Sequence, residues 1–166
     1  MSRSPYFFLE KIKSDGSTEL VDIRTKKYMD TRQDLFPYNG CHSIFSIVEQ
    51  TATNEEYPKM AGIHRGLPFN VNPLIKAEAE YLDDCKYLES CRCRIKPRWF
   101  LYSDLLLYLT KYPKVKDIDD NGRRVKIDNP LFILKNRIDC FISIWDSGWD
   151  DEDDNNLYRI VYRIDY

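Results

Sequence analysis

The stretch that decides the fold is Leu157-Tyr158-Arg159-Ile160-Val161-Tyr162-Arg163-Ile164-Asp165-Tyr166. Tyrosine and isoleucine alternate at every second position, and Leu, Arg, Val, Arg and Asp fill the positions between them. Successive side chains of a β-strand point to opposite faces, so this period of two predicts a strand. We expect its tyrosine and isoleucine face to pack against helices.

A second set of strand signals lies near the N-terminus. Tyr6–Ile12 is rich in strand-forming residues, Ser14-Asp15-Gly16-Ser17 is typical of a turn, and Glu19–Arg24 follows as a second run. This order predicts a β-hairpin. We expect the hairpin and residues 157–166 to belong to one sheet.

Four helices are expected, at residues 40–49, 72–82, 104–111 and 129–145. Asn72-Pro73 and Asn129-Pro130 share one signature, an asparagine cap followed by proline at the first helical position. Ser103 is expected to cap the third helix. The chain has 166 residues, of which 43% are hydrophobic and 31% charged, as in one globular domain. Residues 1–166 are therefore expected to form a single α+β domain, mainly an antiparallel sheet packed by about four helices.

Composition also bears on the partners of the protein. The formal net charge of −2 gives no global attraction to nucleic acid or anionic lipid. No apolar run is long enough to span a membrane, and the first residues lack the features of a signal peptide. Five cysteines without a framework spacing favour reduced thiols. We expect a cytoplasmic protein, in the host cytoplasm if it is viral, and no membrane partner.

Both histidines of the chain lie between Leu35 and Pro68. Within this stretch, residues 62–68 form an irregular segment with glycines on both sides of His64-Arg65. Glycines let backbone N–H groups approach a ligand, and a guanidinium binds carboxylate or phosphate. We therefore predict a small anion-binding pocket formed by His42, His64, Arg65 and Gly66. The alternative is a tight chain reversal in which Arg65 pairs with a carboxylate.

A basic strand is predicted around residues 91–102. Arg92, Arg94, Lys96 and Arg98 would share one face, and Pro97 favours an edge strand. Such a face could bind phosphate, or it could be a solvated edge whose charges prevent strand addition. The possible stacking groups for a bound base are Trp99, Phe100 and Tyr102.

The acidic segment at residues 146–154 is the second candidate for partner binding. It contains Trp149, Asp150 and Asp151, an aromatic residue surrounded by carboxylates. The segment is either a solvated loop or a surface that docks on a basic partner through Trp149.

No metal site and no cofactor are expected. Asp117–Asp128 resembles a calcium-binding loop, but Arg124 stands where an apolar residue is usual, and Asp128 is shorter than the usual glutamate. A hairpin around Asn121-Gly122 explains the same residues. The cysteines lack the paired spacing of zinc ligands. Cys41 and His42 would diverge on a helix, so they do not suggest a nucleophile with its base.

Several landmarks share an order with other proteins, namely Phe45, Arg65-Gly66-Leu67-Pro68, Pro73, Trp99 and Leu105-Leu106. This order resembles a loosely defined set of uncharacterised bacterial and phage proteins. His42 and Ser43 stand where that set has a Tyr-Asp pair, and Ile95–Trp99 replaces its His-Ser-x-Ser-Trp segment. The resemblance implies no activity, and suggests an accessory protein of a phage or bacterium.

We expect a non-enzymatic binding protein that acts on a host protein or a small anionic ligand, with nucleic acid as a less favoured partner. No nucleotide-binding loop, Ser-His-Asp signature or zinc signature is apparent. The alternative is a hydrolase or transferase that acts on a phosphorylated substrate through His42, His64 and Arg65. That alternative requires the three side chains to share one cleft.

Overall fold

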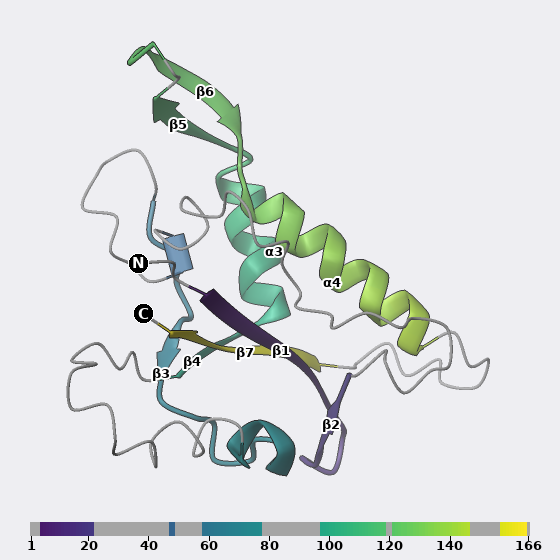
Figure 1. Ribbon diagram of the computed structural model, residues 1–166. Helices are drawn as coiled ribbons and strands as arrows, with labels where there is room; N and C mark the ends of the chain where they lie inside the picture. The colour runs from purple at the N-terminus through teal and green to yellow at the C-terminus, as the bar shows by residue number, and fades with distance from the viewer. Residues whose placement is uncertain are drawn as a thin grey trace, which may run out of the picture.

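The computed structural model describes residues 4–21, 47–48, 58–77, 97–118, 121–146 and 157–165. Its main sheet has five strands in the order β2-β1-β7-β4-β3, and all neighbours are antiparallel (Figure 1). The strands are β1 (Ser4–Ile12), β2 (Thr18–Leu20), β3 (His64–Arg65), β4 (Arg98–Leu101) and β7 (Leu157–Asp165).

The predicted C-terminal strand is β7, at the centre of the sheet. It pairs with β1 along its whole length, from Ser4 opposite Asp165 to Ile12 opposite Leu157. The predicted N-terminal hairpin is also confirmed, because β1 and β2 pair across a turn in which Gly16 has a φ of 81°. The α+β class with a mainly antiparallel sheet is therefore confirmed.

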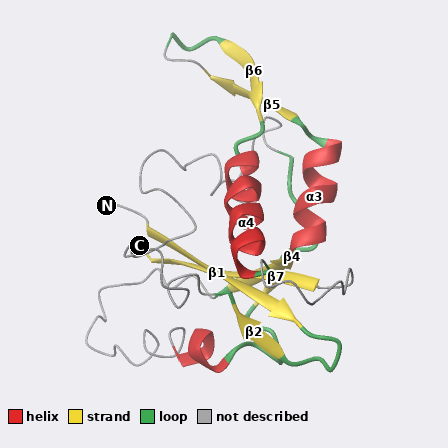
Figure 2. Ribbon diagram, turned by 90° about the vertical axis from the view of Figure 1, so that its right-hand side faces the viewer, coloured by secondary structure: helices red, strands yellow, loops and turns green. Residues whose placement is uncertain are grey.

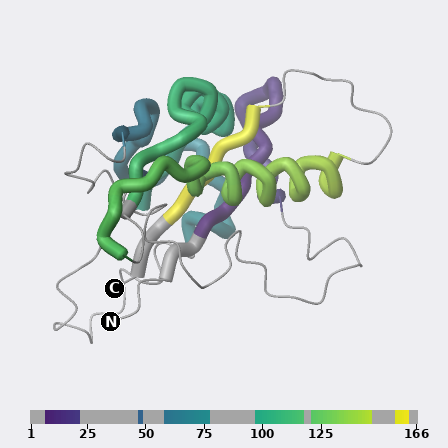
Figure 3. The backbone as a smooth tube through the Cα atoms, turned by 90° about the horizontal axis from the view of Figure 1, so that it is seen from above, coloured from purple at the N-terminus to yellow at the C-terminus, as the bar shows by residue number. Residues whose placement is uncertain are grey.

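Helices α3 (Tyr102–Lys111) and α4 (Leu131–Trp145) cover one face of the sheet, and Figure 3 shows α4 crossing β7 and β1. A short helix at 73–77 lies on the opposite side of the sheet (Figure 2). The helix at 73–77, α3 and α4 fall on three of the four expected helices. Only residues 47–48 of the first expected helix are described, and they are helical.

The tyrosine and isoleucine face of β7 forms the core with the helices, as predicted. Tyr162 stacks on Phe7 with ring centroids 5.3 Å apart, and its hydroxyl donates to the Val48 carbonyl at 2.7 Å. Ile160 is fully buried, and the Tyr158 hydroxyl hydrogen-bonds to Asp146 beyond the end of α4. Both polar tips are therefore satisfied, as buried tyrosines require.

The two helix starts are capped in different ways. Asn129 accepts the Leu131 N–H at 3.0 Å, so the predicted asparagine cap of α4 is confirmed. The predicted Ser103 cap is wrong. α3 begins at Tyr102, directly after β4, and the Asp104 carboxylate accepts the Leu101 N–H at 3.2 Å. With no turn between strand and helix, the cap must come from a side chain that reaches back from the first turn.

A second, two-stranded sheet connects the two helices. It consists of β5 (Lys114–Ile118) and β6 (Arg124–Asp128), which form the predicted hairpin with Gly122 at a φ of 73°. Figures 1 and 2 show this hairpin standing clear of the main sheet, beyond the ends of α3 and α4.

Two expectations about the basic region need correction. The segment at His64-Arg65 is not irregular, because both residues pair with β4. As a result β4 is an interior strand, although Pro97 predicted an edge. Pro97 lies just before β4, where its carbonyl accepts the Gly66 N–H at 2.7 Å, so the missing proline N–H falls at the end of the ladder and not within it.

Candidate binding site at the β3 edge and the following turn

Glycines hold β3 in place from both sides. Gly62 and Gly66 have φ values of 83° and 85°, a region that other residues rarely adopt. A Cβ atom on Gly62 would lie 2.6 Å from the Asp104 carboxylate, whereas one on Gly66 would meet nothing within 4 Å. Gly62 therefore lets the chain pass close to the start of α3, and Gly66 turns it away from the sheet.

His64 and Trp99 form an aromatic contact on the face of the sheet opposite α3 and α4. They are register partners, and their rings stack with centroids 4.0 Å apart and planes 18° apart. The Arg159 guanidinium lies 5.5 Å from the centre of the same tryptophan ring. The contact between Arg159 and Trp99 has the geometry of a cation–π interaction. Trp99 thus lies between exposed His64 and buried Arg159.

Arg65 lies directly opposite Arg98. Hydrogen-bonded and non-hydrogen-bonded pairs alternate in an antiparallel ladder, and Gly66 bonds to Pro97. Arg65 and Arg98 therefore form a non-hydrogen-bonded pair, with Cα atoms about 4.5 Å apart and close side chains. The Arg65 N–H points to the open edge of the sheet. Arg65 is exposed, and it forms no ion pair with any residue that the structure describes.

The chain then enters a turn that carries an exposed aromatic side chain. The Val71 N–H donates to the Pro68 carbonyl at 3.2 Å, which places Phe69 at the tip. Phe69 is fully exposed and Leu74 is 64% exposed, whereas Pro68 and Ile75 on either side of them are buried. The turn is therefore anchored to the protein while its largest apolar side chain points into solvent.

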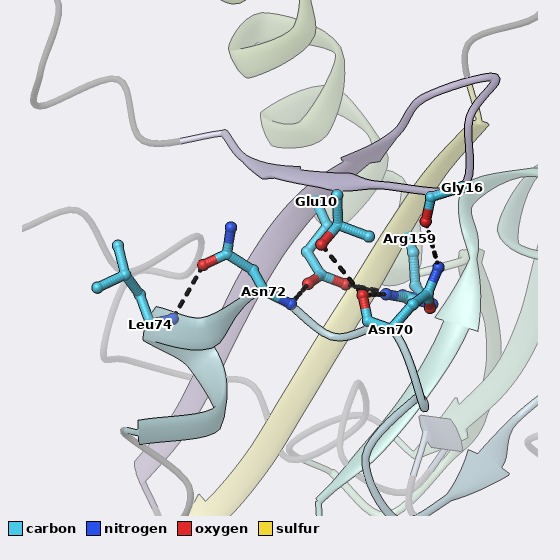
Figure 4. Close-up of polar contacts among 7 residues, drawn as sticks. Glu10, Gly16, Asn70, Asn72, Leu74 and Arg159 are labelled. Atoms are coloured by element: carbon cyan, nitrogen blue, oxygen red, sulfur yellow. Dashed lines mark hydrogen bonds and ion pairs between the residues drawn. The ribbon is translucent and has the colours of Figure 1, made fainter.

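A buried polar network fixes this turn to the sheet (Figure 4). Glu10 of β1 and Arg159 of β7 are register partners, and Arg159 Nη2 lies 2.6 Å from Glu10 Oε2. Arg159 Nη1 donates to Asn70 Oδ1 at 2.8 Å, and the Asn72 N–H donates to Glu10 Oε1 at 2.5 Å. The Asn70 amide in turn donates to the Gly16 carbonyl at 2.9 Å. Both charges are buried and hydrogen-bonded, the condition under which a buried pair is tolerated.

No local pattern in the sequence predicts this network. Glu10 lies in an apolar strand and Arg159 on the second face of β7, and each has the appearance of a surface residue when read alone. Their pairing depends on the register of two strands whose residues are 149 positions apart. One feature of the sequence does indicate this region, namely the Asn70-x-Asn72 pair just before a predicted helix. Asn72 Oδ1 caps that helix by accepting the Leu74 N–H.

Of the predicted anion site, the structure describes His64, Arg65 and Gly66, whereas His42 lies outside the described residues. Neighbouring residues of a strand point to opposite faces, so His64 and Arg65 can meet one ligand only around the strand edge. The anion site and the catalytic alternative through His42 remain predictions.

The other predicted partner residues also lie outside the described part of the chain, namely Arg92, Arg94, Lys96, Trp149, Asp150 and Asp151. Among the predicted stacking groups, Phe100 is fully buried and cannot stack on a ligand. The Tyr102 hydroxyl donates to Asp139.

In the part of the chain that the structure describes, no group of three or more His, Cys, Asp or Glu side chains could hold a metal ion. No helix in that part is long and apolar enough to cross a bilayer. The candidate site consists of the cationic strand edge at Arg65 and the exposed turn at Phe69. Comparison of the chain with protein-family models, curated proteins and solved structures gives no match.

Proposed function

We propose that this is a non-enzymatic binding protein that recognises an acidic partner protein through the segment from β3 to Asn72. The observation that carries the proposal is Phe69, a fully exposed aromatic side chain on a turn that a buried ion pair holds to the sheet. In protein interfaces, aromatic anchors that fill a pocket of the partner contribute most of the binding energy.

Charge indicates the chemistry of the partner. Residues 58–77 contain Lys59, Arg65 and Lys76 and no acidic residue. A second copy of this chain would bring like charges together around Phe69, whereas an acidic surface would be attracted. The proposed partner therefore has an apolar pocket for Phe69 and carboxylates at its rim that attract the cationic side chains of this segment.

A rigid turn favours this role energetically. A backbone that is already held in place loses little entropy when it binds, so less of the interaction energy is spent on ordering it. Asn70 and Asn72 flank the tip of the turn, and both are hydrogen-bonded to the buried pair. Their contacts hold the backbone on the C-terminal side of Phe69.

The setting proposed for this activity is that of a phage or bacterial accessory factor that binds a host protein in the cytoplasm. It is supported by the resemblance of the sequence landmarks and by the thiol pattern. Cys140 is an exposed free thiol, which is compatible with a reducing compartment.

The test is site-specific photo-crosslinking in bacterial cells with p-benzoyl-phenylalanine placed at position 69. The control places the same group at Leu107 of α3, which is 69% exposed and lies outside the proposed surface. We expect one protein to be captured at position 69 and not at 107. Binding of that purified protein should weaken at least tenfold with Phe69→Ala and with Arg65→Ala, and little with Arg137→Ala. Equal capture at both positions, or full binding by Phe69→Ala, would contradict the proposal.

A small anionic ligand is the second candidate, and the Arg65–Arg98 pair favours it. Two guanidinium groups and the outward Arg65 N–H can surround one phosphate or carboxylate. Inorganic phosphate would then raise the melting temperature of the wild type and of Phe69→Ala, but not of Arg65→Ala. The protein-binding proposal instead requires an effect of Phe69→Ala, so the two candidates are distinguished.

A further inference from the structure

The cationic side chains of strands β5 and β6 lie on one face of the hairpin. Lys116 is opposite Lys126, Lys114 is opposite Asp128, and Ile118 is opposite Arg124. Residues that are opposite each other, or two apart on one strand, share a face. Lys114, Lys116, Arg124 and Lys126 therefore share one exposed face, which we call the basic face.

The other face of the hairpin carries Val115, Asp117, Val125 and Ile127. Val115 is buried, and Val125 and Ile127 are half-buried. The strand alternation thus leaves the basic face more exposed than the other face. The hairpin lies beyond the ends of α3 and α4 (Figures 1 and 2), and the four cationic side chains of the basic face are exposed.

The pairing of Lys116 with Lys126 on the basic face does not serve stability. Like charges directly opposite each other destabilise a strand pair, and a two-stranded hairpin is marginal to begin with. Lys116 and Lys126 are such a pair, and neither forms an ion pair with a residue that the structure describes. The acidic residue on this face, Asp128, lies 3.6 Å from Lys114. A polyanionic ligand would turn the repulsion between the two lysines into attraction.

We infer that the basic face is a binding site for the phosphate backbone of double-stranded nucleic acid. A two-stranded β-ribbon has the dimensions to lie along the major groove of a duplex, whose strands carry a phosphate at each base pair. The sequence between β5 and β6 contains two aspartates, Asp119 and Asp120, so binding to phosphates through this connection is unfavourable. The ribbon is expected to bind through its basic face, without reading the base sequence. This inference is independent of the proposed protein-binding function.

The test is fluorescence anisotropy of a labelled 20-base-pair duplex with the full chain, at salt concentrations from 25 to 200 mM. About four phosphate contacts would give a log–log salt slope of about −3.5. The double variant Lys116→Ala/Lys126→Ala should reduce the slope by about 2 and weaken binding at least tenfold at the lowest salt. The control Lys59→Ala/Arg137→Ala removes the same charge from exposed positions elsewhere, and should weaken binding less than threefold.

Three outcomes would overturn the inference. They are no binding at 25 mM salt, equal losses in the two double variants, or hairpin-dependent binding to phosphatidylglycerol vesicles in place of the duplex. Because the double variant removes a repulsion, its melting temperature should equal or exceed that of the wild type. If the double variant melts at a lower temperature than the wild type, duplex binding by the single variant Lys126→Gln becomes the test, because glutamine keeps a long side chain on β6. Undiminished duplex binding by Lys126→Gln would contradict the inference.

Discussion

Asn72 shows how single residues connect the sheet to the surface. Its N–H donates to buried Glu10, while its Oδ1 accepts the Leu74 N–H and starts the helix at 73–77. Arg159, on the other side of Glu10, bonds to Asn70 and lies over Trp99. Removing one partner of a buried ion pair costs about 3–5 kcal/mol. The position of the turn therefore depends on the pair remaining intact.

Gly62 gives a prediction at the same scale. Gly62→Ala should destabilise the protein more than Gly66→Ala. Both changes introduce the strain of a positive φ, about 1–2 kcal/mol, but only the first brings a Cβ to 2.6 Å from the Asp104 carboxylate. Urea unfolding measures both. Equal losses of unfolding free energy would show that Asp104 does not restrict this position.

At the scale of elements, the strand β4 runs into α3 without a connecting turn. This arrangement explains why Asp104, three residues after Leu101, caps the helix. Asn129 performs the corresponding task for α4, and its side-chain amide also donates to the Tyr112 carbonyl at 2.8 Å. The end of α3 and the start of α4 are thus joined at the base of the β5–β6 hairpin.

The capping arrangement predicts that Asp104→Ala costs about 1 kcal/mol, because it removes a cap of the first turn. Ser103→Ala should change stability by less than about 0.5 kcal/mol, since exposed Ser103 lies within the helix. Thermal or urea unfolding of the two variants is the measurement. A larger loss for Ser103→Ala would reverse the assignment of the cap.

An element can be predicted from the sequence when the residues that determine it lie close together in the chain. The period of two in β7, the turn around Gly16 and the Asn-Pro helix start of α4 are each encoded within a few residues, and the structure confirms them. β3 has two residues and exists only because β4 pairs with it, so no periodicity could reveal it. The Glu10–Arg159 network depends on strand register, which local patterns do not contain.

At the scale of the whole molecule, tyrosine hydroxyls connect the two helices to each other and to the rest of the protein. Burial and then the hydrogen bond to Asp139 raise the pKa of Tyr102, and burial followed by the bond to Asp146 does the same to the pKa of Tyr158. Burial raises the pKa of Tyr108 to about 12. All three groups are held in the protonated form by the fold.

This linkage predicts loss of stability at alkaline pH. A tyrosine whose folded pKa exceeds its unfolded value of about 10 stabilises the protein fully below pH 10, and that contribution declines as pH rises toward the folded pKa. The unfolding free energy should therefore fall above pH 10, and it should fall less steeply in Tyr108→Phe, which lacks one titrating group. Parallel curves for wild type and variant between pH 8 and 11 would contradict the assignment.

The central claim is that the turn carrying Phe69 is a fixed part of the sheet. Hydrogen exchange of the Asn72 amide, measured by NMR, tests it most directly because this N–H donates to buried Glu10. We predict that it exchanges as slowly as the amides that join β1 to β7, and that Glu10→Gln accelerates its exchange while those amides remain protected. Exchange of the wild-type Asn72 amide at the rate of an unstructured peptide would contradict the account.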